Sequence, residues 1–174
     1  MKRWLAFAPL VLLIALAGLF VGWSLKRDPE FKPDAMVGQP VPAVAVAPLA
    51  GGPAAPLNGQ VRGPALVNIF ASWCAPCRLE HPELMRLESR GVRIVGVAWR
   101  DKPEDSRAFL AELGDPFALT LSDPEARSGV DLGISGVPET FAVDARGVIV
   151  AKHAGPLDRA AADRLVAALE ASPR

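Results

Sequence analysis

The chain has 174 residues, of which 51% are hydrophobic, and its 19 basic and 19 acidic residues give a net charge of zero. This length allows one domain plus an appendage, and nothing in the charge balance indicates binding to nucleic acid. Only two residues are cysteines, so a scaffold held together by several disulfides is excluded.

The N-terminus carries a long apolar segment. An uncharged run from Trp4 to Leu25 follows Lys2 and Arg3, and as a helix it would span roughly 33 Å, enough to cross the hydrocarbon core of a bilayer. We therefore expect residues 1–25 to form a signal anchor, a single transmembrane helix with a cytoplasmic N-terminus and the rest of the chain outside. The alternative is a cleaved signal peptide, because Ala15-Leu16-Ala17 resembles a cleavage site.

The segment after the anchor is rich in proline, glycine and alanine. Residues 26–36 are expected to be a linker, and residues 37–174 a single folded domain. Within that domain, Val41–Leu49 is predicted to be a short strand at a sheet edge, because it contains prolines. Ala50–Gly63 is predicted to be a turn-rich loop.

From Ala65 onward, apolar runs of strand length alternate with segments of helix length. Strands are predicted at Ala65–Ala71, Arg93–Trp99, Phe117–Leu121, Thr140–Asp144 and Val148–His153. Helices are predicted at Cys74–Glu88 (with Leu79, Leu84 and Leu87 facing the core and a kink at Pro82), from Asp101 as cap to Leu113, at Pro124–Val130 and at Asp158–Ala171. This order predicts an α/β domain, a central mixed sheet with helices on its faces.

Both cysteines lie in one motif, Trp73-Cys74-Ala75-Pro76-Cys77, between a predicted strand and a predicted helix. Cys74 falls at the start of the helix, where unpaired N–H groups and the helix dipole stabilise a thiolate. We therefore expect Cys74 to be the nucleophile. Cys77, three residues further on the same helix face, can resolve a mixed disulfide formed on Cys74. Pro76 fits the first helical turn and stiffens the loop.

Other uses of a Cys-x-x-Cys pair compete with redox chemistry. A c-type haem site needs a histidine directly after the second cysteine, where this chain has Arg78, so haem attachment is excluded. A zinc site could recruit His81 and His153, although no second Cys or His pair is spaced to close it. Two unreactive cysteines are the third alternative. The position of the pair at a strand-to-helix junction favours redox chemistry over the zinc site and the inert pair.

Two segments carry a resemblance to a known family. Asn68–Arg78, with the sequence NIFASWCAPCR, and Gly136–Phe141, with the sequence GVPETF, resemble the thioredoxin superfamily. Within it, the domain is similar to the membrane-anchored thiol:disulfide interchange proteins of cytochrome c biogenesis, the DsbE/CcmG type. The residues that carry this finer resemblance are Cys77-Arg78-Leu79-Glu80-His81, Leu132-Gly133-Ile134, Pro138-Glu139-Thr140 and His153-Ala154-Gly155.

The resemblance implies a thioredoxin-like fold with an N-terminal extension and a central insertion. It implies a thiol:disulfide oxidoreductase, anchored in the bacterial inner membrane by a single pass, with its C-terminal domain in the periplasm. Its substrate would be the CxxCH disulfide of apocytochrome c or a cytochrome-maturation thiol protein, and a transmembrane thiol reductase would supply electrons. We expect a monomer without metal or cofactor other than the redox-active Cys74–Cys77 disulfide.

The resemblance also implies supporting residues around the pair. Pro138 would be a cis-proline facing the cysteines, leaving the backbone of Val137 free to pair with a substrate strand; a trans-proline at a strand start is the alternative. Asn68 stands where thioredoxin has a buried, proton-carrying aspartate, so another acid must serve. Trp73 would pack beside Cys74 and shield it, with a role in the core as the alternative.

Three acids are candidates for the proton carrier: Glu80, Glu139 and Asp123. A partly buried carboxylate has a raised pKa and could exchange protons with Cys77. The first two are favoured over Asp123. The alternatives are that Glu80 is a solvated helix residue, Glu139 an edge charge and Asp123 a helix cap.

Overall fold

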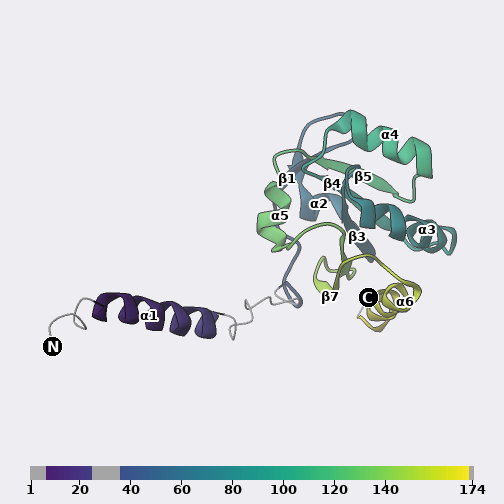
Figure 1. Cartoon of the computed structure of the whole chain (residues 1–174). Coiled ribbons are helices and arrows are strands. Elements are labelled where there is room, and N and C mark those ends of the chain that lie inside the picture. The colour runs from purple at the N-terminus through teal and green to yellow at the C-terminus, as the bar shows by residue number, and fades with distance from the viewer. Residues whose placement is uncertain (1–6, 25–35, 173–174) are drawn as a thin grey trace. The chain divides into compact units, whose positions relative to one another are not determined.

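The structure, a computed structural model, describes residues 7–24 and 36–172 (Figure 1). The chain divides into two compact units, Met1–Lys32 and Pro33–Arg174. The first unit contains α1 (Ala8–Ser24), a 17-residue helix without a charged residue. Across the described ranges, no helix has both the length and the apolar character needed to cross a membrane. Residues 1–6 and 25–35, which complete the expected anchor and linker, lie outside the described residues, so membrane anchoring stays a prediction.

The second unit is built on a seven-stranded mixed sheet with the order β2-β1-β5-β4-β3-β6-β7. The strands are β1 (Ala45–Pro48), β2 (Ala55–Pro56), β3 (Ala65–Phe70), β4 (Ile94–Trp99), β5 (Leu119–Asp123), β6 (Glu139–Val143) and β7 (Ile149–Ala154). The helices are α2 (Leu57–Gln60), α3 (Ala75–Ser89), α4 (Pro103–Leu113), α5 (Arg127–Leu132) and α6 (Arg159–Ala171). β3, β4 and β5 are parallel, whereas β1, β2, β6 and β7 pair antiparallel with their neighbours.

Alternation along the central strand sends its side chains to two separate cores. All six residues of β3 are buried. Leu66 packs with α3 and α6, and Phe70 packs with the cysteines and α4. Val67 and Ile69 face the opposite core, with residues of α2 and α5. Helices α3, α4 and α6 therefore cover one face of the sheet and the short helices α2 and α5 the other (Figure 1).

The predicted strands and helices from Ala65 onward are all present, with ends shifted by up to a few residues. The region before it differs from the prediction. The predicted loop Ala50–Gly63 contains β2 and α2, and β2 lies outside β1, so β1 is not the edge strand. The Gln60 side-chain amide donates to the carbonyls of Val46 and Ala55, at 2.9 and 2.8 Å, which ties this segment to the sheet.

Two predictions about helical residues were wrong. Leu79 is 77% exposed, because the inward positions of α3 are Cys77, Glu80, His81, Leu84 and Leu87, spaced three or four residues apart. Asp101 is not the cap of α4, a position that Lys102 occupies. Its carboxylate accepts hydrogen bonds from Ser72 N, Ser72 Oγ and Ser106 Oγ, and so links the loop before the cysteines to α4. Pro82 lies inside α3, which continues through it.

Candidate active site

The two cysteines lie where β3 passes into α3. Cys74 is the residue that caps α3, and its sulfur accepts a hydrogen bond from Cys77 N at 3.1 Å. Pro76 lies in the first turn, where the missing N–H costs no helical hydrogen bond. Cys74 and Cys77 form a disulfide, with their Cα atoms 5.3 Å apart. The pair is therefore a closed, two-electron acceptor at the positive end of a helix.

The disulfide is buried within an apolar cluster. Cys74 is 3% and Cys77 2% exposed, among residues of β3, β4 and α4 that include Phe70 and Phe109. Trp73, by contrast, is 58% exposed, so it is not a core residue. Its indole Nε1 donates to the carbonyl of Arg100 at 3.0 Å, and its ring centroid lies 6.5 Å from that of Trp99. Trp99, the last residue of β4, therefore lies close to Trp73, the residue that directly precedes the buried Cys74.

The segment before β6 forms a second part of the site. The Val137–Pro138 peptide bond is cis, as the resemblance implies. Val137 is half-buried and packs against the cluster that contains both cysteines. The β3–β6 ladder begins at Glu139, opposite Ile69, so Val137 lies beyond its last pair. Its backbone is thus at the end of the sheet beside the cysteine cluster, and a role in pairing with substrate stays a prediction.

Glu80 is enclosed behind the cysteines. Its carboxyl group is on the inward face of α3, one turn after Cys77, and the residue is 1% exposed. Oε1 accepts a hydrogen bond from Asn68 Nδ2 at 2.8 Å, and Oε2 accepts one from Leu157 N at 2.8 Å. Burial raises the pKa of Glu80 to about 7, although both hydrogen bonds favour the charged form and lower it. The alternative of a solvated helix residue is therefore wrong.

Asn68 positions this acid. Its amide nitrogen donates to Glu80 and also to Thr140 Oγ1 at 3.0 Å, which joins β3, α3 and β6. Its Oδ1 is buried without a hydrogen bond. The position where thioredoxin has an aspartate thus carries a neutral donor here, and the carboxyl group comes from the neighbouring helix instead.

Glu139 is also buried, at 1% exposure, and the alternative of an edge charge is wrong because β6 lies between β3 and β7. Oε1 accepts hydrogen bonds from Ser135 N and Ser135 Oγ, both at 2.7 Å. Oε2 lies 2.8 Å from Lys152 Nζ, an ion pair that lacks hydrogen-bond geometry. Lys152 was not predicted. Its one signal in the sequence was a charge inside a largely apolar predicted strand. Only the sheet register shows that it lies two positions from Ala154, the residue that pairs with Glu139.

The environment of Asp123 differs from those of Glu80 and Glu139. Its carboxylate accepts hydrogen bonds from Arg127 N at 3.0 Å and Ser128 N at 2.8 Å, and a further one from Ser128 Oγ. All these donors belong to the first turn of α5. Ala126 occupies the cap position of α5, so Asp123 is not the cap residue itself, but its carboxylate accepts from the first N–H groups of that helix. A part in proton transfer stays a prediction.

The two histidines are engaged separately. His81 Nε2 lies 3.0 Å from the carbonyl of Gly114 and its ring meets Phe109 edge-on, while His153 Nε2 lies 3.3 Å from the carbonyl of Pro156. Burial lowers the pKa of His81. With both sulfurs in a disulfide, the four groups of the hypothetical zinc site each have other partners.

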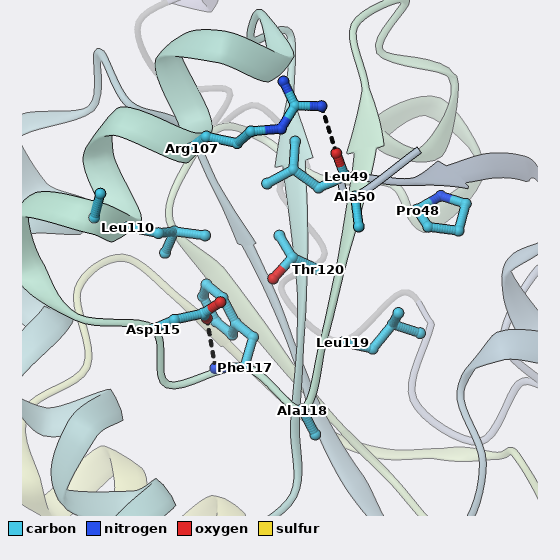
Figure 2. A pocket seen from close by; sticks show the side chains of 11 residues that line it. Pro48, Leu49, Ala50, Arg107, Leu110, Asp115, Phe117, Ala118, Leu119 and Thr120 are labelled. Carbon is cyan, nitrogen blue, oxygen red and sulfur yellow. Dashed lines mark hydrogen bonds between the residues drawn. The ribbon is translucent and has the colours of Figure 1, made fainter. Parts of the chain in front are cut away.

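A pocket of about 560 Å³ lies between α4, β5 and the end of β1 (Figure 2). The Arg107 side chain lines the pocket, and its Nη2 donates a hydrogen bond to the carbonyl of Leu49 at 2.6 Å. Leu49, Leu110 and Phe117 line the pocket and also belong to, or pack against, the cluster around the cysteines. The pocket thus borders that cluster, and none of the predicted site residues lines it.

Comparisons with known proteins show that the chain is similar to thiol:disulfide interchange proteins. The Redoxin family matches residues 36–169. The thiol:disulfide interchange protein HelX of Rhodobacter capsulatus is 42% identical over 163 residues, which cover 90% of each chain. DsbE of Escherichia coli, which bears the same description, is 38% identical over 165 residues, covering 91% of this chain and 89% of that protein.

Solved structures agree with the fold. The crystal structure of a putative thiol:disulfide interchange protein DsbE from Chlorobium tepidum is 26% identical, with a TM-score of 0.63, and covers 76% of this chain and 97% of that one. A thio-disulfide isomerase from Thermus thermophilus is 30% identical, with a TM-score of 0.57, and covers 76% and 96%. The chain belongs to the Redoxin family and, within it, to the DsbE/HelX thiol:disulfide interchange proteins, oxidoreductases whose exchanging pair here is Cys74–Cys77.

Proposed function

We propose that this protein is a periplasmic reductant in cytochrome c maturation, which reduces the CxxCH disulfide of apocytochrome c or of a maturation thiol protein. The observation that carries this proposal is a Cys-x-x-Cys pair at a helix start with a carboxyl group of pKa about 7 one helical turn behind it. Such a group can exchange a proton near neutral pH without leaving its buried position.

The reaction is a two-electron exchange in two steps. In the reduced protein, the Cys74 thiolate attacks one sulfur of the substrate disulfide, forms a mixed disulfide and expels the other substrate sulfur as a thiolate. The Cys77 thiol then loses its proton and attacks Cys74 Sγ, which forms the Cys74–Cys77 disulfide and releases the second substrate sulfur. The substrate gains two electrons and the cysteine pair loses them. The Cys77 proton leaves the pair as Cys77 attacks, and the two substrate thiolates take up protons from water according to their own pKa values.

Glu80 is the group we assign to the proton of Cys77. It lies three residues further on α3, buried and held by Asn68 and Leu157. As a carboxylate it accepts the proton when Cys77 attacks, and as a carboxylic acid it returns one when the disulfide is reduced again. Asn68 Oδ1, which is buried without a hydrogen-bond partner, can accept a hydrogen bond there but cannot take the proton.

The oxidised pair must be reduced again by another dithiol. We propose that a transmembrane thiol reductase supplies these electrons, and that residues 1–25 anchor the protein beside it as a single-pass monomer in the inner membrane. No further cofactor is needed, because the reduced dithiol form of the cysteine pair carries both electrons.

Trapping the substrate tests the proposal. Full-length protein with Cys77→Ser should accumulate a mixed disulfide on Cys74, and mass spectrometry of the trapped species should identify apocytochrome c or a maturation protein. Cys74→Ser is the matched control and should trap nothing. Loss of holocytochrome c on deleting the gene would support the role in maturation. Intact holocytochrome c, with other proteins trapped, would instead indicate a general disulfide reductase or oxidase.

A further inference from the structure

The segment between α5 and β6 connects two anchored ends. Gly133 is the C-terminal cap of α5, and Glu139 is the first residue of β6. Between them lie the exposed Ser135, the half-buried Val137 and the buried Pro138. Because Val137 packs against the cysteine cluster, the position of this segment determines the backbone that a polypeptide bound at the disulfide would meet.

Lys152, on the adjacent strand β7, holds both ends of this segment. Its Nζ lies 2.8 Å from Glu139 Oε2 and donates to the carbonyl of Gly133 at 3.3 Å. The other oxygen of Glu139 accepts hydrogen bonds from the backbone and side chain of Ser135. One ammonium group and one carboxylate thus fix the start, the middle and the end of the segment.

The ion pair is almost fully enclosed. The side chains of Lys152 and Glu139 are each 1% exposed, and Nζ lies 5.2 Å from the centroid of the Phe141 ring. Removing two charges from water costs several kcal/mol per ion, so that well-packed apolar residues often give equal or greater stability. Stability alone therefore does not explain this pair. Fixing one arrangement of the chain is the best-attested use of a buried polar group.

We propose that Lys152 is a positioning residue for polypeptide substrates: through Glu139 and Gly133 it holds the 133–139 segment where the Val137 backbone pairs with the extended chain that flanks a substrate disulfide. The inference rests on the proposed function in one respect, that the substrate is a polypeptide. It does not depend on that polypeptide being a cytochrome.

The role predicts a selective kinetic defect. A peptide with an internal CxxCH disulfide would use the Val137 backbone, whereas bis(2-hydroxyethyl) disulfide has no peptide backbone to pair with it. In single turnovers of reduced full-length protein, Lys152→Met should raise the half-saturating peptide concentration at least tenfold. The limiting rate, and the second-order rate constant with the small disulfide, should stay within twofold of wild type.

A second variant keeps the test valid if Lys152→Met folds poorly. Lys152→Met combined with Glu139→Gln removes both charges, keeps an acceptor for Ser135 and should show the same selective defect. Lys152→Arg should restore part of the peptide affinity, and Lys102→Met, at an exposed lysine, should behave as wild type. Wild-type peptide affinity in the double variant, or equal losses with both disulfides, would overturn the proposal. If wild type itself fails to reduce the peptide, the proposed function fails instead.

Discussion

Glu80 and Glu139 are both 1% exposed, yet their surroundings differ in charge. Neighbouring ladder pairs, Asn68 with Thr140 and Ile69 with Glu139, place the two carboxyl groups on opposite faces of the sheet. Glu80 accepts hydrogen bonds from two neutral groups, whereas Glu139 has a lysine beside it. Neutral donors do not offset the burial of Glu80, so its pKa rises to about 7. The acid without a cation is therefore suited to proton exchange, and the acid with one to holding a segment.

The largest effect should come from removing the cation. Lys152→Met fills a similar volume but leaves Glu139 as a buried charge without a counter-ion, so the free energy of unfolding at pH 7 should fall by about 3–5 kcal/mol. Chemical denaturation measures it. Adding Glu139→Gln should recover most of the loss, and a double variant no more stable than Lys152→Met would contradict the ion-pair account.

Glu80→Gln should have the opposite effect on stability. The pKa of Glu80 is about 7 in the folded protein and 4.5 as the reference value. The folded state therefore keeps a proton that the unfolded state loses, and stability falls as pH rises from 4.5 to 7. At one pKa unit per 1.36 kcal/mol, this penalty approaches about 3 kcal/mol. Glu80→Gln, which cannot ionise, should lack it, as denaturation at pH 4.5 and pH 8 would reveal.

The same substitution should slow the resolving step. Without a carboxylate to accept the proton of Cys77, the release of substrate from the mixed disulfide should slow by about 10²-fold. In wild type this rate should rise with pH through about 7, where Glu80 ionises, and in Glu80→Gln that step should vanish. Rapid-quench alkylation measures the rate. An unchanged pH profile would remove Glu80 from the proton path.

Asn68→Leu should raise the pKa of Glu80 further, an effect smaller than that of Glu80→Gln. Loss of the Asn68 donor removes one of the two hydrogen bonds that favour ionised Glu80. A hydrogen bond to a charged group contributes about 1.5–3 kcal/mol, so the pH step of the resolving reaction should move upward by about one unit or more. Infrared titration of the carboxyl band measures the shift. A step that stays near 7 would show that Asn68 does not tune the acid.

The sequence predicted the part of the fold that depends on local pattern. The apolar run at β3 and the alternation that follows are visible without tertiary contacts. The two-residue strand β2 is not, because it exists only through its pairing with β1. Leu79 was predicted to be a core residue because leucine is hydrophobic, but on that turn of α3 the residues that face the core are Glu80 and His81. A polar residue at an inward position defeats a prediction based on hydrophobicity.

For the site, too, the sequence predicted individual residues but missed a contact that depends on the sheet register. The cysteine pair followed from its motif, and Glu80, Glu139 and Pro138 from the resemblance. Lys152 was missed because its importance depends on which residues lie across the β6–β7 pair, and the register is not readable from one strand. Asp123 shows the converse, since a position suggested by the resemblance has a carboxylate directed at the start of a helix.

Asp123→Ala should therefore give the smallest effect. Loss of the acceptor for the first turn of α5 should lower the free energy of unfolding by about 0.5–2 kcal/mol, the range measured when a side-chain acceptor at a helix start is removed. Asp158→Ala is the matched control, since Asp158 caps α6 by accepting a hydrogen bond from Ala161 N at 2.7 Å. Both variants should keep the rate of the resolving step and its pH profile, because neither contacts the Glu80 carboxyl. A slowed resolving step in Asp123→Ala alone would instead make Asp123 a second acid of the proton path, and the contrast between one proton-exchanging and one structural carboxylate would no longer describe the site.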